Sequence, residues 1–183
     1  MASDSSNEMQ KNNIFENLSC LDGDLLAHYG LNRTFEITIV GSSALIMLDV
    51  VSSNRRTTDI DVLEAPPEMV SFFDLYQMNT MVATFLFTYP ETWQERKQVL
   101  AFSGDCLTVK TMSLEDLTIL KLLAFRTRDQ EDLVDIVKSG KLNWEQLEKL
   151  VKDPTELRIN FDSEEKWLEF FDCYQWLLLK RQS

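Results

Sequence analysis

A Gly-Ser turn, followed one short helix later by two aspartates that alternate with aliphatic residues, constrains this chain more than any other feature. Residues 35–40 are rich in β-branched and aromatic types, which predicts a strand that runs directly into Gly41-Ser42. The apolar stretch 44–51 has helical length, and residues 52–58 form a polar turn. A second strand is predicted over residues 59–63, closed by Pro66-Pro67.

Asp59 and Asp61 are the candidate metal ligands. Residues i and i+2 of a strand share one face, so both carboxylates project together while Ile60 and Val62 enter the core. Their Cα atoms lie ~7 Å apart, which lets both side chains reach one ion or a close ion pair. Hard oxygen ligands beside a phosphate substrate favour Mg²⁺. The structural alternative is a half-exposed strand with a polar face.

The length between the two motifs predicts that they meet. A helix of ~10 residues climbs ~15 Å, and a short turn then returns the chain beside the first strand. Asp59 and Asp61 should therefore lie next to Gly41-Ser42. Gly lets a phosphate approach the backbone closely, and the unpaired amides at a helix start are donors for an anion.

The rest of the chain predicts an α+β fold: a small mixed β-sheet flanked by helices, with a C-terminal helical bundle. Strict βαβα alternation is absent, which disfavours a doubly wound parallel sheet. We expect a disordered tail (1–13), a core (14–112) and a helical region (113–183) packed on the core. The expected elements are helices 14–29 and 68–78, a strand at 81–87, a hairpin of 93–102 with 106–111, and helices from Ser113, Gln130, Asn143 and Ser163 onward.

Charge and composition limit the partners. The 183 residues carry a net charge of −12, which repels bulk nucleic acid and anionic membranes. No run of ~18 apolar residues and no secretory leader is visible, so we expect a cytoplasmic protein without a membrane partner. The three cysteines are far apart and fit neither a disulfide framework nor a paired metal site.

At these residues the sequence resembles the nucleotidyltransferase superfamily with the DNA polymerase β-type fold. The first motif is Val40-Gly41-Ser42-Ser43-Ala44-Leu45 with Arg56-Thr57-Thr58-Asp59-Ile60-Asp61-Val62. A second stretch, residues 115–124 followed by 128–133, resembles the later motifs of abortive-infection toxin-type bacterial nucleotidyltransferases and related uncharacterised domains. The resemblance spans about residues 37–136.

The resemblance implies roles for individual residues. Asp59 and Asp61 would bind the metal, and Lys121 would face the triphosphate, with Asp129 lining the same cleft. The implied nucleotide contacts come from both motifs: Gly41, Ser42, Ser43, Arg56, Thr58 and Asp132. The alternative for the second stretch is a helical hairpin whose charged residues form local ion pairs.

One departure bears on catalysis. Many members of the superfamily carry a third carboxylate on a later strand, where this chain has residues 106–110 and offers Thr108. Asp105 is the nearest substitute, and we predict it as a third metal ligand.

Two hypotheses follow. The first is a metal-dependent nucleotidyltransferase that moves an NMP from an NTP to an acceptor hydroxyl on an RNA end, a protein or a small molecule. It would be the toxin of a toxin–antitoxin pair, with a cognate antitoxin or another protein as partner. The second is a non-catalytic nucleotide-binding or protein-interaction module with a degenerate site.

Overall fold

The chain forms two compact units. The structure, a computed structural model, describes residues 8–81 and 89–182. The first unit comprises Met1–Phe85 with Gln98–Thr111, and the second comprises Leu86–Lys97 with Met112–Ser183. No helix in the described ranges combines the length and the apolarity needed to cross a membrane.

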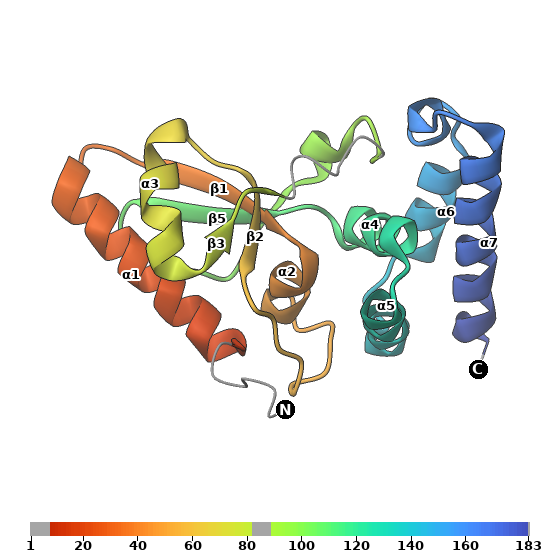
Figure 1. Ribbon diagram of the computed structural model, residues 1–183, viewed down its shortest axis with the longest axis horizontal. Helices are drawn as coiled ribbons and strands as arrows, with labels where there is room; N and C mark the ends of the chain where they lie inside the picture. Colours follow the sequence, from red (N-terminus) through yellow and green to blue (C-terminus); the bar gives the residue numbers. More distant parts are fainter. Residues whose placement is uncertain (1–7, 82–88, 183) are drawn as a thin grey trace, which may run out of the picture. The chain divides into compact units, whose positions relative to one another are not determined.

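The first unit is built on a five-stranded mixed sheet in the order β3-β2-β1-β5-β4 (Figure 1). The central strand β1 pairs antiparallel with β2 and parallel with β5, while β2–β3 is parallel and β4–β5 is antiparallel. The strand bounds are Phe35–Val40 (β1), Ile60–Glu64 (β2), Met78–Asn79 (β3), Gln98–Val99 (β4) and Leu107–Thr111 (β5). The α+β fold class with a small mixed sheet is therefore confirmed.

The two faces of this sheet differ in chemistry. Paired residues on neighbouring strands share a face, so Phe35, Ile37 and Ile39 lie with their partners Leu107 and Val109 on a buried apolar face. These side chains and the buried stripe of α1 (Lys11–Tyr29) form the core of the unit. The opposite face carries the polar members of the ladders: Glu36, Thr38, Asp61, Glu64, Thr108 and Lys110.

Helix α1 is one continuous helix, although Asp22-Gly23 is a plausible break in the sequence. The Asp22 carboxylate accepts hydrogen bonds from the backbone N–H groups of Asp105, Cys106 and Leu107, at 2.8, 2.9 and 2.7 Å. This anchor ties the middle of α1 to the start of β5, and it compensates for the weak helix propensity of the Asp-Gly pair.

The predicted tail contains residues with defined contacts. The predicted tail 1–13 includes Met9, which is buried and pairs with Thr57 through backbone hydrogen bonds of 2.6 and 2.9 Å. Helix α1 then starts at Lys11 instead of residue 14. The remaining tail, residues 1–7, lies outside the described residues.

Three other elements differ from prediction. The predicted helix 68–78 consists of α3 (Val70–Phe73) between two 3₁₀ turns, and it ends at Gln77, which has a left-handed backbone with φ of 53°. The predicted hairpin reduces to β4 against the end of β5, where Gln98 pairs with Thr111, while Trp93–Arg96 is a 3₁₀ helix. Of the predicted strand 81–87, residues 82–87 lie outside the described residues.

The second unit is helical and recruits the segment before β4. Its helices are α4 (Leu114–Ala124), α5 (Thr127–Ser139), α6 (Trp144–Lys152) and α7 (Glu164–Arg181). Arg96 donates two hydrogen bonds to the buried Asp116 carboxylate, of 3.0 and 2.8 Å, so residues 89–97 belong here and not to the predicted 14–112 core.

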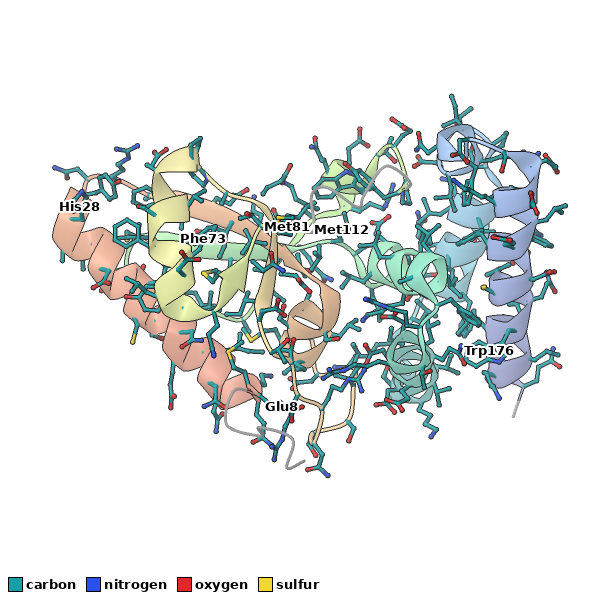
Figure 2. The ribbon with its side chains drawn as sticks, in the orientation of Figure 1. Glu8, His28, Phe73, Met81, Met112 and Trp176 are labelled. Carbon is teal, nitrogen blue, oxygen red and sulfur yellow. The ribbon has the colours of Figure 1, made fainter. Side chains whose placement is uncertain are left out.

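Three helix starts in this unit follow the sequence signals, whereas α5 begins at Thr127 and not at the predicted Gln130. Ser113, Asn143 and Ser163 each accept a hydrogen bond from a backbone N–H in the first helical turn, as their positions predict. The aromatic stripe of α7 is partly inward: Phe170 and Tyr174 are buried, and Trp176, labelled in Figure 2, packs edge-on against Phe125 with ring centroids 5.3 Å apart.

Replacing Asp22 by Asn should lower the free energy of unfolding by ~1–3 kcal/mol at neutral pH, because an amide nitrogen would then face backbone donors. The exposed Glu16→Gln on the same helix is the control. Burial raises the pKa of Asp22, but the backbone amides of residues 105–107 outweigh it and hold the pKa below its ordinary value.

A carboxylate whose pKa is lower in the folded state stabilises the fold at pH values above its unfolded-state pKa of ~3.9. This stabilisation is lost as the pH falls through the folded-state pKa. The difference between wild type and Asp22→Asn in urea unfolding should therefore be largest above pH ~5 and shrink below pH ~4. A difference that is constant over this range would contradict the anchoring role.

Candidate functional site

Gly41 and Asp61 come together where β1 ends and α2 (Gly41–Met47) begins. Val40 pairs with Asp61 in the β1–β2 ladder, which brings the second strand back beside the Gly-Ser turn as the spacing predicts. Gly41 has φ of 68°, and a Cβ at this position would lie 2.3 Å from Asp61 Oδ2. The carboxylate therefore occupies the space that only glycine leaves open.

Asp59 lies immediately before β2 and is half-buried, as is Asp61. The Thr58 hydroxyl donates to Asp59 Oδ1 over 3.2 Å, and the Asn79 side-chain amide donates to Asp59 Oδ2 over 3.2 Å. Asn79 is also the ladder partner of Asp61 on β3. It joins the two aspartates, and the sequence analysis missed it because β3 is only two residues long.

Two carboxylates at one sheet edge fit a hard divalent cation. Asp59 and Asp61 supply carboxylate oxygens, and the missing Cβ at Gly41 makes room for the Asp61 carboxylate itself. Among the described residues, no group of three or more His, Cys, Asp or Glu side chains is arranged to hold a metal. Two carboxylates with remaining positions left to water and phosphate are the usual protein contribution to a Mg²⁺ site in phosphoryl-transfer enzymes.

The nucleotide contacts predicted around this pair are only partly supported. Ser42 is half-buried beside Gly41, but Ser43 is fully buried and its hydroxyl donates to the Val40 carbonyl over 2.9 Å. Ser43 therefore stabilises the turn and is removed from the predicted nucleotide contacts. Arg56 is exposed and lies 3.8 Å from Glu8, and Thr58 supports Asp59.

Asp105 lies at the wrong end of the sheet for the predicted metal role. β5 is parallel to β1, and its start pairs with Phe35, whereas Asp61 pairs with Val40 at the other end. Five strand steps separate these levels, and Asp105 precedes the first residue of β5 by two positions, so Asp105 is at least ~16 Å from the aspartate pair. Thr108 does lie on the polar face with Asp61, but β5 contains no carboxylate.

Lys121, Asp129 and Asp132 form a buried ion cluster in the second unit. Lys121 Nζ lies 2.9 Å from Asp129 Oδ1 and 2.7 Å from Asp132 Oδ2, and Lys121 is only 8% exposed. Arg126 Nε donates to the other oxygen of Asp129 over 2.7 Å. Burial raises the pKa of Asp129, but the hydrogen bonds from Arg126 and Lys121 outweigh it and lower the pKa overall. The cluster joins α4 to α5.

The cysteines offer no second reactive centre. All three are free thiols, and burial together with the neighbouring Asp22 raises the pKa of Cys106 to about 11. A thiol of that pKa is protonated at neutral pH and is a poor nucleophile.

Gly41→Ala should destabilise the protein by at least ~1 kcal/mol more than Gly140→Ala. Both glycines have a positive φ, near 68° and 66°, but a Cβ at Gly140 meets nothing within 4 Å. Gly140→Ala thus reports the backbone term of ~1–2 kcal/mol alone. Adding Asp61→Ala to Gly41→Ala should recover the excess in urea unfolding. Equal losses for the two glycines would refute the contact.

Lys121→Met should lower the free energy of unfolding by ~3–5 kcal/mol, because it removes a positive charge from between two buried carboxylates. Lys152→Met is the matched control, since Lys152 is exposed and pairs with Glu148 within α6; its effect should be small. Thermal unfolding midpoints at neutral pH provide the measurement. Similar shifts for both variants would show that the cluster does not stabilise the fold.

One comparison with known protein families finds a match over most of the chain. The family model described as "Nucleotidyltransferase of unknown function (DUF6036)" matches residues 16–183, which includes every element that builds the aspartate pair. No curated protein and no solved structure matches the chain. The match covers most of the sequence and both units, and the chain therefore belongs to the DUF6036 family of nucleotidyltransferases.

Proposed function

We propose that this protein transfers a nucleoside monophosphate from an NTP to an acceptor hydroxyl, with Asp59 and Asp61 holding Mg²⁺ against the triphosphate. One observation carries the proposal: the Asp61 carboxylate lies against Gly41, with Asp59 tied to the same strand pair through Asn79. The arrangement places two anionic groups at the edge of a polar sheet face.

The residues of the chain prepare the site in three ways. Gly41 leaves space for the Asp61 carboxylate, which lies against the start of α2. Thr58 and Asn79 orient Asp59 through donors that carry no charge. Ser43 holds the turn by bonding the Val40 carbonyl. Mg²⁺, when bound, would neutralise phosphate charge and polarise the transferring phosphoryl group.

The proposal gives no catalytic or nucleotide-binding role to Lys121, Asp129 and Asp132, although the resemblance implies such roles. Together with Arg126, which pairs with Asp129, these three buried residues form a set of two positive and two negative charges, and this supports a structural role. The proposed transfer therefore depends on the aspartate pair of the first unit and assigns no charge stabilisation to Lys121.

The acceptor and the partner follow from charge and from the resemblance. A net charge of −12 disfavours a large RNA and favours a protein side chain or a small cationic molecule as acceptor. An RNA end is the third class to test. A toxin role, with a cognate antitoxin as partner, is part of the proposal because of the resemblance in residues 115–133 and would show as growth arrest on expression.

A non-catalytic nucleotide-binding module is the second candidate. The observation that favours it is the composition of β5, which supplies Thr108 and Lys110 to the polar face but no carboxylate. Binding of Mg²⁺–NTP without release of pyrophosphate would select this candidate.

Asp59→Asn combined with Asp61→Asn should weaken Mg²⁺-dependent NTP binding by on the order of 100-fold or more, a loss of ~2.7 kcal/mol. The fold should be retained, because removing two neighbouring like charges relieves repulsion in the metal-free protein. Calorimetric titration with each NTP, with and without Mg²⁺, measures the effect.

The matched control for this double variant is Asp49→Asn with Asp74→Asn, which changes the charge equally at two exposed positions. It should bind as wild type does. Marked unfolding of the Asp59/Asp61 variant, or unchanged Mg²⁺–NTP affinity, would exclude the metal site.

A further inference from the structure

The ladder between β1 and β2 contains a bulge at Leu63. Val40 pairs with Asp61 and Ile39 with Val62, but Thr38 pairs with Glu64, so the register shifts between Thr38 and Ile39. β2 has one more residue than β1 over this stretch. A bulge of this kind redirects the side chains that follow it, and bulges are over-represented next to active sites.

The bulge changes the face on which Glu64 lies. Thr38 and Val40 are two residues apart on a regular strand, so they share a face, and their partners Glu64 and Asp61 share it too. Without the extra residue, Glu64 would lie on the same face as Val62, toward the apolar core. The bulge therefore brings a third acidic residue onto the polar face that carries Asp61.

The surroundings of Glu64 hold it on this face. The hydroxyl of Thr38, which is 1% exposed, donates to Glu64 Oε2 over 3.1 Å. Lys110 is the partner of Thr38 on its other side, and its Nζ lies 2.6 Å from Glu36 Oε2. Glu64, Thr38 and Lys110 thus form one row across the sheet, next to the row of Asp61 and Val40.

The distance between Glu64 and Asp61 bears on whether Glu64 would act as a metal ligand or as a general base. The two rows are two strand steps apart, ~7 Å between Cα atoms. Glu64 does not form a three-residue metal group with Asp59 and Asp61, since no such group exists among the described residues. Glu64 therefore lies one row from Asp61, beside the aspartate pair and outside any metal group of the described residues.

We infer that Glu64 is the third carboxylate of this site and acts as the general base that accepts the proton of the acceptor hydroxyl. The inference rests on the proposed nucleotidyltransferase function. The acceptor oxygen forms a bond to the α-phosphorus of the NTP, and the bond from that phosphorus to the β-bridging oxygen breaks. Pyrophosphate leaves with the electron pair, and the hydroxyl proton passes to the Glu64 carboxylate and then to solvent. Thr38 is a positioning residue.

The test compares Glu64→Gln with Glu36→Gln. Glu36 is on the same face and bonds Lys110, but it lies one row further from Asp61. The assay measures pyrophosphate release from each of the four NTPs with Mg²⁺, with water, total cell RNA or total cell protein as acceptor. Affinity for Mg²⁺–NTP is measured separately by calorimetry.

Glu64→Gln should lower kcat by ~10²–10⁴-fold while Mg²⁺–NTP affinity stays within about twofold of wild type. Gln keeps an oxygen that accepts from Thr38, so the unfolding midpoint should be unchanged. Glu64→Asp retains a carboxylate and should keep more activity than Glu64→Gln. Thr38→Val should lower kcat by ~10-fold with little change in KM, and Glu36→Gln should match wild type.

Each possible result of these assays supports or overturns the inference about Glu64. A wild-type rate in Glu64→Gln overturns the inference but leaves the proposed function intact. A large loss of Mg²⁺–NTP affinity in Glu64→Gln overturns it too, because Glu64 would then be a ligand. If Glu64→Gln fails to fold, the other two variants decide. A wild-type kcat in Thr38→Val together with a lowered kcat in Glu36→Gln then overturns the inference. A wild type that binds Mg²⁺–NTP but releases no pyrophosphate overturns both the inference and the transferase activity.

Discussion

The close approach of the Asp61 carboxylate to Gly41 is the constraint on which the first unit depends. It requires β1 to end at Val40, β2 to run antiparallel beside it, and a residue without a Cβ at the turn between β1 and α2. The end of β1 and the start of β2, which α2 separates in the sequence, are thereby held so close that a methyl group at Gly41 would collide with Asp61. The backbone at Gly41 has a positive φ and a close contact at the centre of the site proposed to bind nucleotide.

The two faces of the sheet differ in composition, since one is apolar and the other is polar. One face carries Ile37, Ile39 and Val109, which are fully buried, and the other carries carboxylates, hydroxyls and Lys110. Because strand side chains alternate strictly, a residue moves from one face to the other only where the ladder is irregular. The bulge at Leu63 is such a place, and it adds Glu64 to the polar face without disturbing the buried partners Ile39 and Val62.

The sequence predicts what depends on neighbours in the chain and misses what depends on strand direction and irregular pairing. The meeting of Gly41 with Asp61 follows from the length of one helix and one turn. Asp105 was misplaced because β5 runs parallel to β1, and no local pattern reveals that direction. Asn79 belongs to a two-residue strand, and Glu64 depends on a bulge, so neither shows a periodic signal. The caps at Ser113 and Asn143 were predicted, because capping is a local interaction.

Three aspartates of this protein differ in the number and charge of their hydrogen-bond donors. Asp22 accepts three hydrogen bonds from backbone amides, and Asp129 is paired with the cations Lys121 and Arg126, so both carboxylates stabilise the fold. Asp59 is bonded by a hydroxyl and a side-chain amide, both neutral and at 3.2 Å. Neutral donors orient a carboxylate without cancelling its charge. Asp59 therefore has fewer and longer hydrogen bonds than Asp22 and lacks the cationic partners of Asp129, as the cation-binding role proposed for it requires.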